Sequence, residues 1–206
     1  MNNMKHKLAV NAGGSRAARK DILAGANLAQ TLQLPAELTR FQLVQAAFDY
    51  AKRIHAKHTR DDGSPYIHHP LRVCLILYNE FQVRDENALA AAILHDTMEM
   101  SDATSAQLAR DFNPRVAGMV NILSKTTASS EEAYYRRIKE ADSDTQKIKF
   151  ADRLDNMRDL PTSPSKKKRA SYIEETKRIF LPWARSFDAR IYDLLQGAIE
   201  RAEATI

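Results

Sequence analysis

The spacing of apolar residues is the feature that most constrains the fold of this chain. From residue 37 onward, apolar side chains recur every three or four positions. The first such run contains Phe41, Val44, Phe48 and Ala51, and it leads to His55 on the same face. This period is typical of an α-helix with one buried face. No segment shows the alternation of apolar and polar residues that a half-buried strand requires. The sequence therefore predicts an all-α fold.

Prolines, glycines and polar residues divide this helical region. Residues 59–66 form a polar loop interrupted by Gly63 and Pro65, and Pro70 is expected to open the next helix. Further helices are predicted at 71–81, 86–100, 105–112, 114–124, around Tyr134, at 144–160, and at 170–204 with a bend near Pro182. Residues 1–35 are expected to form a tail, partly disordered or a short helix. The remaining 36–206 are enough for one domain with a substantial core.

Composition narrows the class of protein. The chain is 44% hydrophobic and 28% charged, as is ordinary for a soluble globular protein. No apolar run approaches the ~20 residues that span a bilayer, and the N-terminus lacks the apolar core of a secretory signal. The single cysteine, Cys74, agrees with a reducing compartment and lies in an apolar run that predicts a core position. We therefore expect a cytoplasmic protein with no membrane contact.

The charge balance favours an anionic partner. The net charge is +5 and the isoelectric point is near 9.3, which suits either a phosphorylated small molecule or nucleic acid. The most basic run, residues 166–169, is interpreted as a solvated loop that leads into a helix. Nucleic-acid binding is disfavoured because no aromatic residues interleave with this run.

A candidate metal site centres on the dipeptide His95-Asp96. The pair lies in an otherwise apolar helical segment, where an unpaired carboxylate is costly to bury and a divalent metal would compensate its charge. His55 on the first core helix and Asp152 on a later one supply further ligands. Two imidazoles and two carboxylates suit Mn²⁺, Fe²⁺ or Zn²⁺. The alternative is structural: a buried histidine and an aspartate in an ordinary ion pair.

Helical spacing adds two polar residues to this candidate site. Glu99 follows His95 by four positions and shares its face, so it is placed to orient or deprotonate an attacking water. Asn156 follows Asp152 by four positions, and its amide suits a water or a phosphate oxygen. In the alternative interpretation, Glu99 is simply solvated helix surface.

Three motifs together resemble the hydrolase domain of RelA/SpoT homologs. They are HAKHTRDDGSPYIHHP at 55–70, HDTMEM at 95–100 and KFADRLDNMRDL at 149–160. The resemblance covers about 41–160, and more loosely the segment YIEETKRIFLPWA near the end. It implies an HD-domain helical bundle with a mononuclear site, and a stand-alone small alarmone hydrolase. Such an enzyme uses manganese to remove the 3′-pyrophosphate from ppGpp or ppApp.

The resemblance also implies roles for individual residues. The metal ligands would be His55, His95, Asp96 and Asp152, and Glu99 and Asn156 would act on the water and the phosphates. The substrate-binding residues would be Arg60, Lys125, Tyr134 and Arg137, although the last two also fit an amphipathic helix surface. The expected partner is an anionic nucleotide, and a homodimer is left open.

Two departures from the family pattern leave the activity open. Met100 stands where the family has an aspartate after Glu99, and His58 stands where relatives usually carry glutamine. An active enzyme is the preferred interpretation, with Asp102 as a candidate substitute for the missing acid. The alternatives are a phosphatase acting on the 2′-phosphate of NADPH, and a binding module that senses alarmones without hydrolysing them. The base preference and the native metal are not fixed by the sequence.

Overall fold

The computed structural model describes residues 33–205, and this part of the chain is helical. Within these residues there is no strand, only an isolated bridge between Thr59 and Pro65 in the polar loop. The predicted all-α class is therefore confirmed. The predicted tail lies almost wholly outside the described residues.

The helices follow the predicted order, with short irregular turns between some of them. Their bounds are α2 Gln42–Ile54, α3 His68–Leu75, α4 Glu86–Leu94, α5 Thr97–Met100, α6 Ser105–Asp111, α7 Pro114–Leu123, α8 Glu131–Lys139, α9 Ser143–Asp159, α10 Lys166–Glu175, α11 Leu181–Phe187 and α12 Ala189–Glu203. A π-helical turn, Ile76–Glu80, extends α3, and a second, Thr176–Phe180, links α10 to α11.

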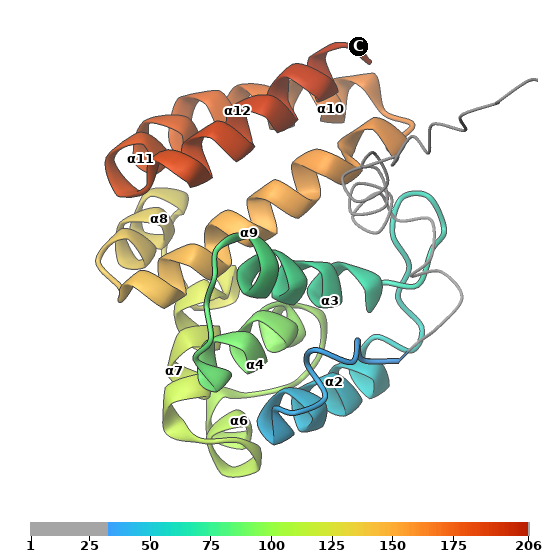
Figure 1. Ribbon diagram of the computed structural model, residues 1–206, viewed down its shortest axis with the longest axis vertical. Coiled ribbons are helices and arrows are strands. Elements are labelled where there is room, and N and C mark those ends of the chain that lie inside the picture. Colours follow the sequence, from blue (N-terminus) through green and yellow to red (C-terminus); the bar gives the residue numbers. More distant parts are fainter. Residues whose placement is uncertain (1–32, 206) are drawn as a thin grey trace, which may run out of the picture. The chain divides into compact units, whose positions relative to one another are not determined.

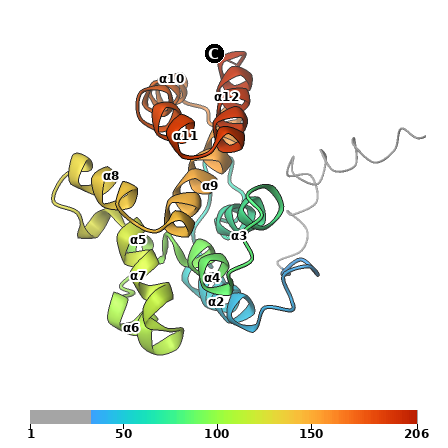
Figure 2. The same cartoon turned by 60° about the vertical axis from the view of Figure 1, so that its left-hand side comes forward.

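Helix α9 lies at the centre of this arrangement. It contacts α3, α4, α7 and α8 on one side and α12 on the other, so helices far apart in sequence meet around it (Figures 1 and 2). Helix α4 is nearly as enclosed, because α2, α3, α7 and α9 all pack on it. Its residues from Ala88 to Leu94 are completely buried. Four alanines among these seven residues let the neighbouring helices approach closely.

Side-chain caps fix several of the helix starts. Asp85 accepts hydrogen bonds from the Asn87 and Ala88 amides at the start of α4, and Asp142 accepts one from Thr145 at the start of α9. Thr104 and Gln107 form a reciprocal capping box at α6. Each cap satisfies amides that have no partner within the helix. Helices α4, α6 and α9 therefore begin at defined residues.

Two predicted helices are broken in the structure. The predicted helix at 86–100 ends at Leu94 and restarts at Thr97, which leaves His95 and Asp96 in a turn. The predicted helix at 170–204 does not simply bend at Pro182, which lies in the first turn of α11, where a proline needs no amide donor. The chain breaks instead at Asp188, whose side chain caps α12. None of the helices described here is long and apolar enough to cross a membrane.

Candidate metal centre and adjoining cavity

Three buried side chains from three helices converge beside α9. His69 lies in the first turn of α3, His95 directly follows α4, and Asp152 lies in the middle of α9. One potential ligand atom from each lies within 4.8 Å of those of the other two. All three residues are at least nine-tenths buried. Two imidazole nitrogens and a carboxylate oxygen at this separation are suited to a divalent metal ion.

Asp96 borders the same cluster because the helix breaks beside it. Adjacent side chains of an unbroken helix point about 100° apart, whereas here Asp96 Oδ2 lies 3.1 Å from His95 Nε2 and 3.6 Å from His69 Nε2. The hydroxyl of Tyr66 donates a hydrogen bond to the same oxygen at 2.6 Å. The turn therefore directs two consecutive side chains toward one centre.

The orientation of His95 leaves one ring nitrogen available inside the protein. Its Nδ1 lies 2.7 Å from the carbonyl oxygen of Ala92, to which it donates a hydrogen bond. Its Nε2 is buried and makes no well-aligned hydrogen bond among the described residues, although Asp96 Oδ2 lies 3.1 Å away. A buried polar atom without a partner is costly, and a metal ligand with its other nitrogen bonded to a carbonyl has this geometry. The residues present therefore fit a metal ion.

The electrostatics of the cluster are those of a cation site. Burial lowers the pKa of His95, but Asp96 and Asp152 outweigh it and raise that pKa to about 9. Burial raises the pKa of the Asp152 carboxyl, but Lys149 and the two histidines outweigh it and hold the value well below the ordinary range. In the metal-free protein, positive charge on Lys149 and on the two histidines stabilises the ionised carboxylate of Asp152. A divalent ion would take over that role.

His55, one of the predicted ligands, is not part of the three-residue cluster. It directly follows α2, its ring packs against Tyr66 with centroids 4.9 Å apart, and its Nδ1 lies 3.2 Å from Nδ1 of His58. Burial is the main cause that lowers its pKa to about 4. The cluster instead contains His69, which lay within the motif at 55–70 but was not singled out. The signal that could have found it is its place directly before Pro70, which marked the predicted start of that helix.

Lys149 is a second residue of the site that the sequence pattern did not indicate. Its ammonium group lies 2.8 Å from Asp152 Oδ2, and Asn156 Nδ2 donates to Asp152 Oδ1 at 2.6 Å. Both partners come from the same helix, at positions three before and four after the aspartate. Lys149 is buried, and its ion pair with Asp152 offsets the cost of removing the ammonium group from water. Asp152 is therefore held at both oxygens by α9 itself.

The cluster opens into a cavity of about 140 Å³. Glu99, Lys125 and Tyr134 line it together with the cluster residues. Glu99 is exposed, and its carboxylate accepts a hydrogen bond from the Lys125 amide at 2.6 Å. Neither Met100 nor Asp102 belongs to this lining. Glu99, the acid that the motif retains, therefore lines the cavity that contains the cluster, whereas Met100, which replaces the second acid, does not.

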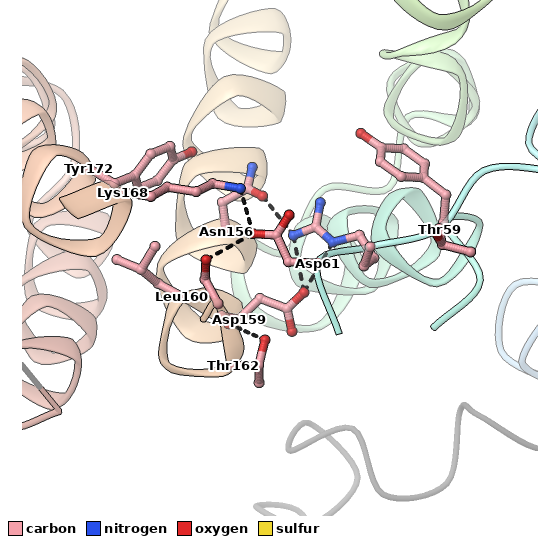
Figure 3. Close-up of a pocket in the computed structure, with 11 residues that line it drawn as sticks. Thr59, Asp61, Asn156, Asp159, Leu160, Thr162, Lys168 and Tyr172 are labelled. Carbon is pink, nitrogen blue, oxygen red and sulfur yellow. Dashed lines mark hydrogen bonds and ion pairs between the residues drawn. The ribbon is translucent and has the colours of Figure 1, made fainter. Parts of the chain in front are cut away.

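A second cavity of about 240 Å³ adjoins the first and shares Tyr66, Asn156 and Tyr172 with it. It contains Arg60, whose guanidinium donates to Asn156 Oδ1 at 2.9 Å and to Asp159 Oδ2 at 3.0 Å. Figure 3 shows Asn156 and Asp159 of α9 facing Asp61 of the loop, with Lys168 and Tyr172 of α10 on the other side. Together the two cavities can take an elongated, charged ligand.

Two residues that were predicted to bind substrate, Tyr134 and Arg137, form hydrogen bonds within the protein. Tyr134 is buried and donates to the carbonyl oxygen of Leu123 at 2.8 Å while its ring lines the cavity. Arg137 lines neither of the two cavities and donates to the Ser124 carbonyl at 2.8 Å and to the Thr127 hydroxyl at 2.9 Å. It therefore braces the segment that carries Lys125.

Comparison with known proteins gives consistent results. The HD domain family model matches residues 47–190. The guanosine-3′,5′-bis(diphosphate) 3′-pyrophosphohydrolase of Mus musculus is 32% identical over 175 residues, which covers 80% of this chain and 90% of the mouse protein. The protein of the same activity from Aquifex aeolicus is 35% identical over 148 residues, and there the match spans only 21% of the relative.

A solved structure is also similar. Its protein is described as a metazoan ortholog of SpoT that hydrolyses ppGpp, and it superimposes with a TM-score of 0.70 at 27% sequence identity. The similarity covers 80% of this chain and 97% of that structure.

Proposed function

Because this chain belongs to the HD domain family, as its motifs predicted, we propose that it is a metal-dependent 3′-pyrophosphohydrolase of nucleotide alarmones such as ppGpp. The observation that carries the proposal is the buried group of His69, His95 and Asp152, whose ligand atoms all lie within 4.8 Å of one another. The similarity to the mouse and Aquifex hydrolases supports the same activity.

The ligand set that we propose is His69, His95, Asp96 and Asp152, with His69 in place of His55. The separations of the ligand atoms and the positions of Asp96 Oδ2 support this set. Its mixture of nitrogen and oxygen donors suits Mn²⁺, with Fe²⁺ or Zn²⁺ as substitutes. Such an ion, when bound, supplies Lewis acidity to a phosphate oxygen and lowers the pKa of a coordinated water.

The reaction that we propose is attack by water on the 3′-diphosphate. The water oxygen bonds to the phosphorus next to the ribose 3′ oxygen, and the bond between that phosphorus and the 3′ oxygen breaks. The products are pyrophosphate and the nucleotide, whose 3′ oxygen gains a proton. Glu99 is the group placed to take the proton of the water, because its carboxylate is exposed to the cavity that contains the cluster. The positive charges of Lys125 and Lys149, which line this cavity, offset the negative charge of the phosphates.

The nucleoside end of the substrate fits the second cavity. Arg60 offers a planar cation at its wall, Asn156 lies between the two cavities, and Tyr172 lines both. We propose that the diphosphate lies at the cluster and the base lies beyond Asn156. The names of the relatives support a guanine base, and ppApp is the competing substrate to be tested.

Product analysis tests the proposed function. Protein stripped with a chelator and then reloaded with Mn²⁺ is incubated with ppGpp, ppApp and NADPH in parallel, and the products are separated by ion-exchange chromatography. We expect pyrophosphate from ppGpp with the reloaded protein and none with the stripped protein. Inorganic phosphate from NADPH alone would indicate a 2′-phosphatase instead. Nucleotide binding without any product would indicate a sensing module.

The control variant is Asp152→Asn, which keeps the size of the side chain and removes one anionic ligand. It should lose both metal content and turnover, whereas wild-type activity in this variant would contradict the proposed site.

A further inference from the structure

Four polar residues occupy one face of α9. Counted from Asp152, the other three follow after three, four and seven positions: Asp155, Asn156 and Asp159. This spacing places all four along one face of the helix. Asp152 belongs to the metal cluster and Asp159 lines the second cavity. Asp155 lies between them, is only 2% exposed and lines neither of the two cavities. A buried carboxylate between two functional ends of a helix requires an explanation.

We propose that Asp155 is a positioning residue for the metal ligand His69, and that Arg72 and Asp159 extend the same network to Arg60. This inference rests on the metal-dependent function proposed above. It assigns a role to Asp155 and Arg72 that neither the motifs nor the ligand set requires.

The contact between Asp155 and His69 defines how the imidazole is presented. Asp155 Oδ2 lies 2.7 Å from His69 Nδ1, and both side chains are almost fully buried. An ionised carboxylate can only accept a hydrogen bond, so the proton of a neutral His69 must be on Nδ1. The unprotonated Nε2 then faces the cluster, 3.3 Å from Asp152 Oδ1. A carboxylate behind a ligating histidine also raises its basicity as a ligand.

Arg72 keeps this buried carboxylate ionised and in place. Its Nε donates to Asp155 Oδ1 at 2.7 Å and its Nη2 to Asp155 Oδ2 at 3.0 Å, which is a two-point contact. The same Nη2 donates to Asp159 Oδ2 at 2.9 Å. Without Arg72, Asp155 would be a buried charge held only by a histidine.

The network returns to the cluster through the second cavity. Asp159 accepts from Arg60 Nε at 3.2 Å and Nη2 at 3.0 Å, and Arg60 in turn donates to Asn156 at 2.9 Å. Asn156 then donates to Asp152 Oδ1 at 2.6 Å. A continuous series of hydrogen bonds therefore runs from one proposed ligand, His69, to another, Asp152. The half of the series at Asp155 supports the metal ligand, and the half at Asp159 holds the loop residue Arg60.

Two matched variants separate these halves. Asp155→Asn keeps the size of the side chain but removes the anionic acceptor, and it should weaken Mn²⁺ binding by roughly 10- to 100-fold. Asp159→Asn should leave Mn²⁺ affinity within about threefold of wild type and raise KM for ppGpp about tenfold, because Arg60 loses a charged partner. The control is Asp142→Asn, which removes a carboxylate from the start of the same helix, where asparagine also caps well.

The primary measurement is titration of the full chain with Mn²⁺ alone, followed by electron paramagnetic resonance, so that it does not depend on turnover. If wild-type protein binds Mn²⁺ and hydrolyses ppGpp but Asp155→Asn binds the ion equally well, the inference fails and the proposed function stands. If wild-type protein binds no Mn²⁺, both fail.

A second measurement is independent of how well the variant folds. Long-range proton–nitrogen spectra of the Zn²⁺-loaded wild-type protein should show His69 protonated at Nδ1. A proton on Nε2 would overturn the inference.

Discussion

The assignment of His69 rather than His55 to the metal centre can be tested with a matched pair of variants. Replacing either histidine by asparagine keeps a polar group near the position of Nδ1 and removes Nε2. In His69→Asn, a donor to Asp155 is preserved while the ring nitrogen 3.3 Å from Asp152 Oδ1 is lost. In His55→Asn, a polar group still faces His58, and the three-residue cluster keeps all its atoms.

The expected magnitudes follow from these positions. Changing a residue that only supports a ligand typically weakens metal binding 10- to 100-fold. Loss of a ligand itself should therefore cost at least about 100-fold, or about 3 kcal/mol of binding free energy. His69→Asn should show this loss. His55→Asn should stay within about threefold of wild type, because His55 contacts His58 through Nδ1 and is not a member of the three-residue cluster.

The assay is isothermal titration of metal-free protein with Mn²⁺, and it requires no substrate. Circular dichroism of both variants controls for folding. The reasoning would be refuted if His55→Asn lost Mn²⁺ as completely as His69→Asn, since His55 would then be a ligand, as the motif at 55–70 first predicted. Equal retention of Mn²⁺ by both variants would exclude both histidines as ligands.

Three further predictions concern neighbouring groups. Glu99→Gln should keep Mn²⁺ affinity and lose about 100-fold or more in kcat, and unchanged turnover in steady-state assays would exclude Glu99 as the base. Lys149→Met removes the ion pair at 2.8 Å from Asp152 and should destabilise the metal-free protein by about 3 kcal/mol in urea unfolding, with part of the loss restored by Mn²⁺. The pKa of His55 is lowered on folding from 6.5 to about 4, so its contribution to stability is present above pH 6.5 and lost as the pH falls through 4. Thermal unfolding of metal-free protein should show this loss of about 3 kcal/mol, and it should be absent in His55→Asn.

Periodicity predicted the helices but not their interruptions. The apolar face from residue 86 onward continues without a glycine or proline, so nothing in the pattern marks the turn at His95 and Asp96. Packing imposes that turn, because Asp96 is held by Tyr66 from a different part of the chain. The break at Asp188 had a local signal, an aspartate that caps α12, which the prediction of one helix over 170–204 did not take into account.

The choice between histidines also required the folded structure. His55 continues the apolar face of the first helix, and that position made it a reasonable ligand. In the structure it follows the helix end, while His69 enters the cluster from the start of α3. Its partner Asp155 is 86 residues away in the sequence, and Arg72 meets Asp155 across 83 residues. No spacing rule within one helix can reveal such pairs, whereas the position of Asn156 beside Asp152 follows from the four-residue spacing within α9.

The distribution of charge explains why the Met100 departure need not remove hydrolysis. The carboxylate that reaches the cavity at this end of the cluster is Glu99, which is fixed by the Lys125 amide, whereas Met100 does not line the cavity. A second acid at position 100 would therefore act on Glu99 or on neighbouring groups rather than on the cluster directly. Its absence leaves the ligand atoms and the proposed proton acceptor in place. The consequence to expect is an altered rate with an intact metal site, and the comparison of Met100→Asp with wild type measures it as kcat at unchanged Mn²⁺ affinity.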